Sequence, residues 1–145
     1  MFKKYFMLLA FFFLGITYAS DSLYNLTVKA DDLRDNKGMV QFSLYNKEGT
    51  IPDKKLNLYF KMKRVPVTNK TAEVTFRNLP KGDYAVSIYH DENNNGTIDK
   101  GLILPLEGVG LTNFQSIDFF HLPNFKSASF ELDKDTICHV KIMYF

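Results

Sequence analysis

The sequence has very little cysteine. Cys138 is the single cysteine among 145 residues, so no disulfide can form within the chain. A catalytic thiol is not expected, because the neighbouring His139 would point to the opposite face of a strand. The alternation of Cys138 with Val140 and Ile142 instead predicts a small, buried apolar side chain.

The chain also lacks an excess of charge of either sign. It has 18 Lys and Arg residues against 16 Asp and Glu residues, and Lys3 and Lys4 are the only charged residues in the first nineteen. Without those nineteen residues, 16 basic residues balance 16 acidic ones. This balance gives no electrostatic reason to expect binding to nucleic acid or to an anionic membrane surface.

Long apolar runs are missing beyond the N-terminus. Residues 1–19 comprise two lysines, an apolar stretch and the small residues that a signal peptidase reads, which predicts a signal peptide. The stretch is short for a membrane span, and an uncleaved N-terminal anchor is the alternative. No cysteine follows directly, so a lipid anchor is not expected. We therefore expect residues 20–145 to form one exported domain, periplasmic or secreted, without integral membrane insertion.

No stretch has a convincing helical period, whereas apolar residues recur at every second position in six runs. The runs are Leu26–Ala30, Val40–Leu44, Leu56–Met62, Ala72–Phe76, Tyr84–His90 and Cys138–Tyr144. Turn-forming residues separate them, which predicts an all-β fold: an antiparallel β-sandwich of about seven strands, immunoglobulin-like or transthyretin-like. The predicted core includes Val74, Phe76, Tyr84, Val86, Ile88, Val140 and Ile142.

Residues 91–124 interrupt this alternation. A connection of this length in a compact domain is usually functional or disordered. This one is rich in Leu, Ile and Phe, so it has the apolar side chains needed to stay folded. We expect one long ordered loop that packs on the sandwich.

The start of this segment has the spacing of an EF-hand calcium loop. The oxygen ligands at its first, third, fifth, seventh and ninth positions would come from Asp91, Asn93, Asn95, the Thr97 carbonyl and Asp99. Gly96 stands at the sixth position, where the chain must turn. The twelfth position, which supplies a bidentate Glu in such loops, is Leu102. We predict that Glu107 folds back to provide the missing carboxylate of a structural calcium site. Glu92 is a second candidate for this carboxylate, although it alternates away from the other ligands; a water-completed site and a metal-free turn are the alternatives.

Motifs of established enzymes are missing from the rest of the sequence. The three histidines lack metal-ligand spacing, no Gly-x-Ser-x-Gly elbow occurs, and no glycine-rich phosphate loop precedes a helix. The sequence therefore favours a protein that is not an enzyme.

Three motifs in order, within residues 90–99, 105–113 and 123–130, resemble the secreted bacterial family DUF2141. The turn at residues 76–84 also resembles that of transthyretin-like and carboxypeptidase-regulatory-like sandwiches. The family resemblance implies a sandwich fold and export, and it implies no activity because the family has none established.

These observations predict an exported, non-enzymatic binding or accessory protein of the cell envelope, with a partner in the envelope or outside the cell. Two alternatives stay open. One is a metal-dependent envelope enzyme whose site lies within residues 91–124 and uses Asp91, Asp99, Glu107 or His90. The other is a carrier of a small apolar ligand, which would need a cavity inside the protein.

Overall fold

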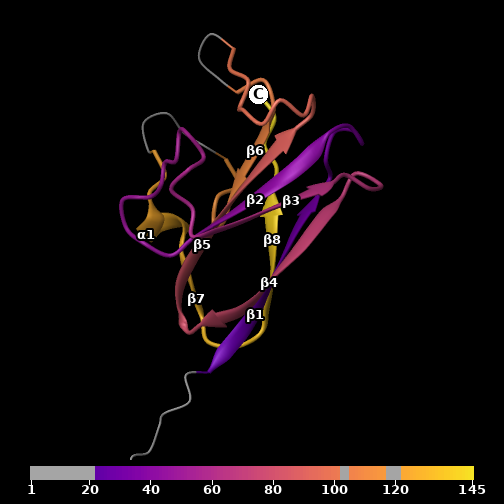
Figure 1. Ribbon diagram of the computed structural model, residues 1–145. Helices are drawn as coiled ribbons and strands as arrows, with labels where there is room; N and C mark the ends of the chain where they lie inside the picture. Colours follow the sequence, from indigo (N-terminus) through magenta and orange to yellow (C-terminus); the bar gives the residue numbers. More distant parts are fainter. Residues whose placement is uncertain (1–21, 102–104, 117–121) are drawn as a thin grey trace, which may run out of the picture.

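The computed structural model describes residues 22–101, 105–116 and 122–145, which form eight strands and one short helix (Figure 1). In chain order these are β1 (Leu23–Asp31), β2 (Met39–Tyr45), β3 (Lys61–Pro66), β4 (Ala72–Pro80), β5 (Gly82–Asp91), β6 (Gly108–Leu111), α1 (Phe125–Ala128), β7 (Phe130–Leu132) and β8 (Thr136–Lys141). The predicted signal peptide lies outside the described residues. In the described part of the chain, no helix is long and apolar enough to cross a membrane.

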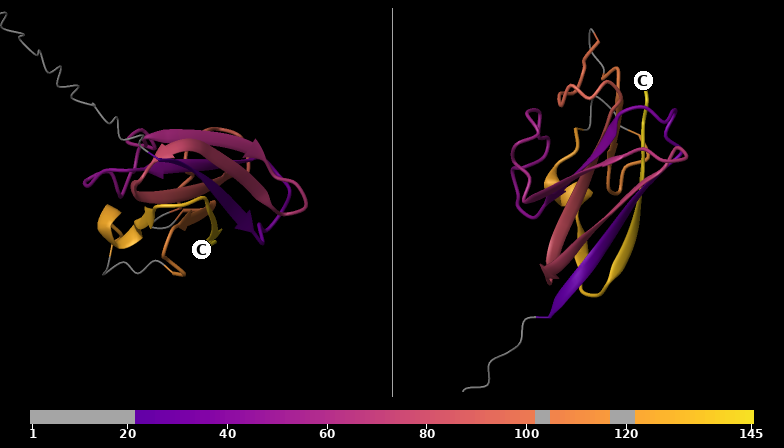
Figure 2. Two further views of the ribbon diagram at one scale, coloured as in Figure 1. Left: turned by 90° about the horizontal axis from the view of Figure 1, so that it is seen from below. Right: turned by 45° about the vertical axis from the view of Figure 1, so that its right-hand side comes forward.

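The strands form two packed sheets, which confirms the predicted all-β sandwich (Figures 1 and 2). One sheet has three strands in the order β4-β1-β8. The other has five strands: four in the order β3-β2-β5-β6, and β7, which also pairs with β5. β6 pairs with the second half of β5, while β7 pairs with its first residues. The pairing of β1 with β8 is parallel, which is an exception to the predicted antiparallel pattern.

The core lies between the two sheets. Side chains alternate between the faces of a strand, so every second residue of β1 and β4 points inward. Leu26, Val28 and Ala30 on β1 are fully buried, and they face β4 residues in the paired register. All seven core residues predicted from the sequence are buried: Val74, Phe76, Tyr84, Val86, Ile88, Val140 and Ile142.

The predicted strand run Leu56–Met62 is wrong, because the strand in this region is β3, which begins only at Lys61. Leu58 and Phe60 are about half exposed. The Leu58 amide donates to the carboxylate of Asp53 at 2.7 Å, so it belongs to a turn rather than to a strand ladder. The alternation of apolar residues is present here, but Leu58, Phe60 and Met62 are all exposed.

The prediction of a single long loop over residues 91–124 is wrong, because strand β6 lies within this segment. β6 has four residues, two of them glycine, so it carries too few side chains to produce an alternating signal. Phe114, after β6, and α1 pack on the outer face of the five-stranded sheet. A second apolar cluster forms there from Tyr45, Ile51, Ala85, Leu111, Phe125 and Ala128. Part of this sheet is therefore buried on both faces.

β6 also joins the two sheets at one side of the sandwich. Val109 donates to the carbonyl of Met143 at 3.0 Å, and the Met143 amide donates back at 2.7 Å. The chain after β8 passes so close that a Cβ atom at Gly110 would lie 2.6 Å from the carbonyl oxygen of Lys141. A glycine at position 110 is therefore required by this contact.

Candidate functional site

The candidate metal loop begins where β5 ends, and it stands at one end of the sandwich near the C-terminus (Figure 1). Asp91 is the last residue of β5 and its side chain is fully buried. The neighbouring strand β2 approaches through Gly38, which has a φ of 68°. A Cβ atom there would lie 1.9 Å from the Asp91 carbonyl oxygen, so only glycine lets the chain pass at this point.

The carboxylate of Asp91 closes the loop on itself. It accepts hydrogen bonds from the backbone amides of Asn95 at 3.1 Å and Gly96 at 2.9 Å. Gly96 has a φ of 75°, which turns the chain back toward Asp91. Arg64 of β3 forms an ion pair with the same carboxylate. A buried carboxylate needs such a partner, because desolvation of an unpaired charge is costly.

The next three predicted side-chain ligands contact one another. Asp99 accepts from the side-chain amides of Asn93 at 2.5 Å and Asn95 at 2.9 Å. The Asn95 side-chain oxygen accepts from the amide of Thr97 at 2.8 Å. Together with the bond from the Asn95 amide to Asp91, these contacts bring the four predicted side chains into one cluster. Within the described residues, no lysine or arginine forms an ion pair with Asp99.

Glu107 is folded back on this loop and is only 4% exposed. One carboxylate oxygen accepts from the amide of Glu92 at 3.1 Å, and the other accepts from the amide of Asp99 at 3.0 Å. The Tyr89 hydroxyl donates to the second oxygen at 2.6 Å. Glu107 therefore holds both ends of the segment 92–99 through backbone amides.

The Tyr89 hydroxyl lies between two acceptors, because it also contacts the carbonyl of Thr97. Burial raises the pKa of Tyr89 well above its usual value, and the adjacent Glu107 carboxylate raises it further. The hydroxyl therefore stays neutral and can donate one proton to one acceptor at a time. Two of the six predicted ligands, the Thr97 carbonyl and Glu107, thus meet at Tyr89 and not at Asp91.

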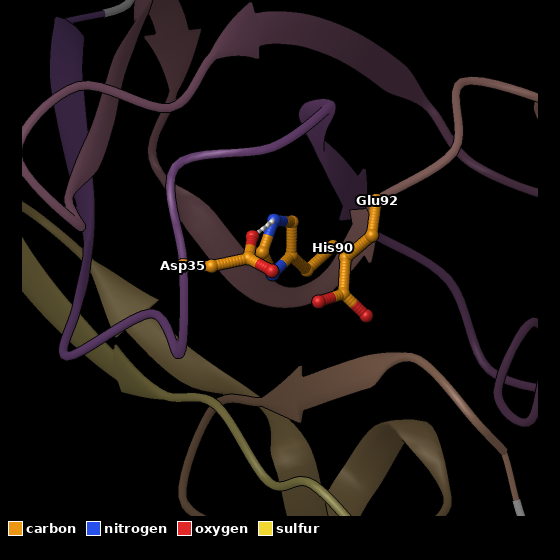
Figure 3. A group of neighbouring side chains, drawn as sticks. All are labelled: Asp35, His90 and Glu92. Atoms are coloured by element: carbon orange, nitrogen blue, oxygen red, sulfur yellow. Dashed lines mark ion pairs between the residues drawn. The ribbon is translucent and has the colours of Figure 1, made fainter.

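A second group of polar side chains, which sequence reasoning missed, lies beside the loop (Figure 3). Asp35, His90 and Glu92 bring ligand atoms within 4.8 Å of one another. His90 comes from β5, Glu92 follows it, and Asp35 belongs to the turn between β1 and β2. Asp35 lies more than fifty residues from the other two in the sequence, and no spacing rule connects them.

The contacts of this group do not fit a metal site. His90 Nε2 lies 2.8 Å from the carbonyl of Lys37, so it must carry a proton and donate. His90 Nδ1 then accepts from the hydroxyl of Tyr144 at 2.8 Å. Glu92 pairs with Arg34 through both carboxylate oxygens. Both ring nitrogens and the Glu92 carboxylate are therefore already engaged, and the group links three segments of the chain.

Asp35, the third member, is held by the backbone. It accepts from the amide of Lys37 at 2.8 Å. This hydrogen bond lowers the pKa of Asp35, and it outweighs the opposing effect of burial. Asp35 therefore stays ionised and fixes the turn that carries the Lys37 carbonyl to His90.

Comparisons with known proteins give one match, to a protein family. Neither a search of the curated proteins nor a search of the solved structures found a match to the chain. Residues 28–139 match a family described as an uncharacterized protein conserved in bacteria. The match spans the sandwich from β1 to β8 and covers more than half of the chain. The chain therefore belongs to this bacterial family, DUF2141.

Proposed function

We propose that the protein is an exported, non-enzymatic binding or accessory protein of the bacterial cell envelope, and that its loop 91–99 holds a calcium ion. Membership of a bacterial family supports a bacterial host, and the signal-like residues 1–19 support export to the cell envelope. Mass spectrometry of the protein isolated from its host tests export. A chain beginning at Ser20 is expected, and an intact Met1 would contradict the proposal.

The contact between the four side chains Asp91, Asn93, Asn95 and Asp99 is the observation that carries the calcium proposal. Calcium prefers carboxylate and carbonyl oxygens, and this cluster offers both types. A carbonyl oxygen has two lone pairs, so the Asn93 oxygen, which accepts the Asn95 amide, keeps one for a cation. The Asn95 oxygen accepts both the amide and the hydroxyl of Thr97, so it would have to release the hydroxyl to bind an ion. Asp99 in particular accepts hydrogen bonds from two neutral side-chain amides, and no lysine or arginine of the described residues forms an ion pair with it. A bound cation would supply the positive charge at this carboxylate.

Glu107 supports the site from behind in this proposal. Its carboxylate holds the amides of Glu92 and Asp99, so the loop is fixed at both ends before an ion binds. To serve as a direct ligand, as the sequence suggested, Glu107 would have to release these donors. Preorganisation of this kind lowers the entropic cost of binding.

Arg64 competes with the ion for Asp91. Its guanidinium group already neutralises this carboxylate, and its side chain is 31% exposed, so it has room to move away. With one of two carboxylates paired in this way, we expect the weak affinity of extracellular calcium sites, with a Kd of about 10⁻⁴–10⁻³ M. At roughly tenfold excess over Kd, binding would stabilise the fold by about 1.4 kcal/mol.

Calorimetry and thermal melting with calcium added to chelator-treated protein test the proposal. The wild type should bind calcium and gain a few degrees in Tm, whereas Asp99→Asn should lose most of both effects. Asp83→Asn, an exposed carboxylate on β5, is the matched control and should behave like the wild type. No heat and no change in Tm at 10⁻² M calcium would leave the loop as a metal-free turn, which would contradict the proposal.

Arg64→Gln provides an independent test of the same site. Removal of the guanidinium leaves the buried Asp91 without its cation, so the variant should melt lower than the wild type in chelator. Calcium should then raise its Tm by more than it raises that of the wild type. An equal or smaller rise would show that calcium does not bind at Asp91.

The engagement of the titratable groups supports a non-enzymatic role. His90 is hydrogen-bonded through both ring nitrogens, and Glu107 accepts three hydrogen bonds. Asp91 is paired with Arg64. A general acid or base needs an atom that is available to a substrate, and these side chains are occupied by the fold.

A further inference from the structure

A cavity of about 140 Å³ lies on the outer face of the five-stranded sheet, and none of the carboxylates of Asp91, Asp99 and Glu107 lines it. Strands β2, β5 and β6 form its floor, and residues from the segments around 51–56, 98 and 123 form its walls. The walls are mostly apolar, with Ile51, Leu56, Ile98, Val109 and Leu111 among the lining side chains. An apolar cavity of about 150 Å³ in another protein binds benzene, so a single ring fits a space of this size.

One end of the cavity is polar. Asp53, Tyr45 and Ser87 line it, and they are joined by hydrogen bonds. The Tyr45 hydroxyl lies 3.2 Å from Asp53 Oδ2 and 3.4 Å from the Ser87 hydroxyl. Because a carboxylate only accepts, Tyr45 donates to Asp53, and Ser87 donates to Tyr45. Burial raises the pKa of Tyr45 to about 12, so this donor stays protonated.

The Asp53 carboxylate has one oxygen that these contacts leave unused. Oδ2 also accepts from the Leu58 amide at 2.7 Å, whereas Oδ1 is buried and has no hydrogen-bond partner. Among the described residues, Asp53 Oδ1 is the one buried side-chain nitrogen or oxygen without a hydrogen-bond partner. Native structures pair nearly all such atoms, and Asp53 lines the cavity, so a small rotation of its carboxylate would present this unused acceptor to a donor in the cavity.

We propose that this cavity binds a small apolar amine, with a ring of about benzene size against the apolar walls and an ammonium group at the Asp53 carboxylate. Asp53 is the only charged residue among the described residues that line the cavity. A charged donor on a carboxylate forms a stronger hydrogen bond than a neutral one, which favours an amine over an alcohol. The proposal does not depend on calcium, and it gives the alternative of an apolar-ligand carrier a specific location.

Benzylamine and benzyl alcohol, titrated into the full-length mature protein, test the proposal. Binding is followed by amide chemical shifts in NMR spectra. Benzylamine should shift the amides of Asp53, Ser87 and Leu111, and it should bind at least several-fold more tightly than benzyl alcohol. An absence of shifts at saturating benzylamine, or shifts confined to residues outside the cavity, would overturn the proposal and leave water as the partner of Asp53.

Two variants test separately the contribution of the Asp53 charge and that of the cavity volume to binding. Asp53→Asn should weaken benzylamine binding about tenfold and leave benzyl alcohol within about threefold, because the charge-assisted bond is lost. Asp83→Asn is the matched control and should bind like the wild type. Val109→Phe should fill the cavity and abolish binding of both compounds while the amide spectrum stays dispersed. Unchanged benzylamine affinity in Asp53→Asn, or in a folded Val109→Phe variant, would contradict the assignment.

Discussion

At the scale of single residues, Glu107 shows how much one carboxylate contributes to the loop. Its two oxygens accept three hydrogen bonds from two backbone amides and one hydroxyl. A glutamine at this position keeps one acceptor oxygen and introduces a donor. At least one of these donors then has no acceptor inside the protein, and burial of an unpaired donor is unfavourable.

Glu107→Gln should therefore destabilise the fold by about 1–3 kcal/mol in urea unfolding, even in the presence of chelator. Amide hydrogen exchange should accelerate most at Glu92 and Asp99. Glu48→Gln, an exposed residue in the turn after β2, should change neither quantity. Unchanged exchange at Glu92 and Asp99 would show that the carboxylate does not hold the loop.

Tyr45 makes stability depend on pH in the alkaline range. Its pKa is about 12 in the folded protein because of burial, against about 10 in an unfolded chain. Between these values the unfolded chain releases the proton first, so the unfolded state gains stability as pH rises. The contribution of neutral Tyr45 to the unfolding free energy is fully present below pH 10. About 2–3 kcal/mol of this contribution should be lost by pH 12.

Urea unfolding of the wild type and Tyr45→Phe at several values between pH 9 and pH 12 measures this effect. The variant lacks the titrating group, so the difference in unfolding free energy between the two proteins should shrink as pH rises. A constant difference across this range would show that burial does not perturb Tyr45. The other buried tyrosines are present in both proteins and cancel in the comparison.

At the scale of elements, the direction of a strand's side chains decides the cost of a substitution. Phe76 of β4 is 1% exposed in the core, whereas Phe60, just before β3, is 45% exposed. Phe76→Ala should cost about 3–5 kcal/mol of unfolding free energy, because it removes a buried ring and leaves a cavity. Phe60→Ala should cost less than about 1 kcal/mol. Similar losses for both, measured by urea unfolding, would mean that the inward face is assigned incorrectly.

β6 depends on the absence of side chains at its glycines. Gly110→Ala would place a methyl group 2.6 Å from the Lys141 carbonyl, so the two backbones must move apart. We expect a loss of about 1–3 kcal/mol and faster exchange of the Val109 and Met143 amides, which pair across this contact. Gly82→Ala on β5 is the control, since its new methyl group would meet nothing nearer than 3.8 Å. Equal stability of the two variants would contradict the close approach.

Alternation of apolar residues predicted the fold because it reports burial on one side of a strand, and five of the six runs lie on strands or their ends. It failed at Leu56–Met62, where the same pattern occurs without a covering sheet. It also missed β6, because a four-residue strand with two glycines has no pattern to read. Both failures arise where backbone pairing or turn geometry, rather than burial of one face, determines the structure.

At the scale of the whole molecule, Tyr144 joins segments that are far apart in the sequence. Its hydroxyl accepts from the Arg34 amide at 3.1 Å and donates to His90 at 2.8 Å. Arg34 in turn lies over the Tyr144 ring and pairs with Glu92. The turn after β1, the end of β5 and the C-terminal residues are therefore connected through one side chain.

Tyr144→Phe should remove both hydroxyl bonds and leave the buried Nδ1 of His90 without a donor. We expect a loss of about 1–3 kcal/mol in unfolding free energy. The variant keeps the aromatic ring, so its packing is the same as in the wild type. Tyr59→Phe is the control, because the partly buried Tyr59 packs on the second apolar cluster and not on this network. Equal stability of Tyr144→Phe and the wild type would show that the hydroxyl has no structural role.

Part of the candidate site could be predicted from the sequence, because some of its residues are neighbours along the chain. Residues 91–99 are local, so their spacing revealed that they share a loop. The positions of Arg64, Asp35 and Tyr144 depend on strand order and on the path of the C-terminus, which local spacing does not encode. The unpaired oxygen of Asp53 likewise emerges only when the segment 46–60 is folded over the sheet.

The open edge of the five-stranded sheet has a consequence for how the protein behaves when it is concentrated. Among the described strands, β3 pairs with β2 alone, so its other side offers free backbone groups to a second copy. Two β3 strands meeting antiparallel about their centre would place Lys63 of each copy opposite Arg64 of the other, and like charges in that position repel. Pro66 at the end of β3 removes one donor from the edge. The arginine that neutralises Asp91 should thus also disfavour pairing of this edge with a second copy, because it brings like charges together there.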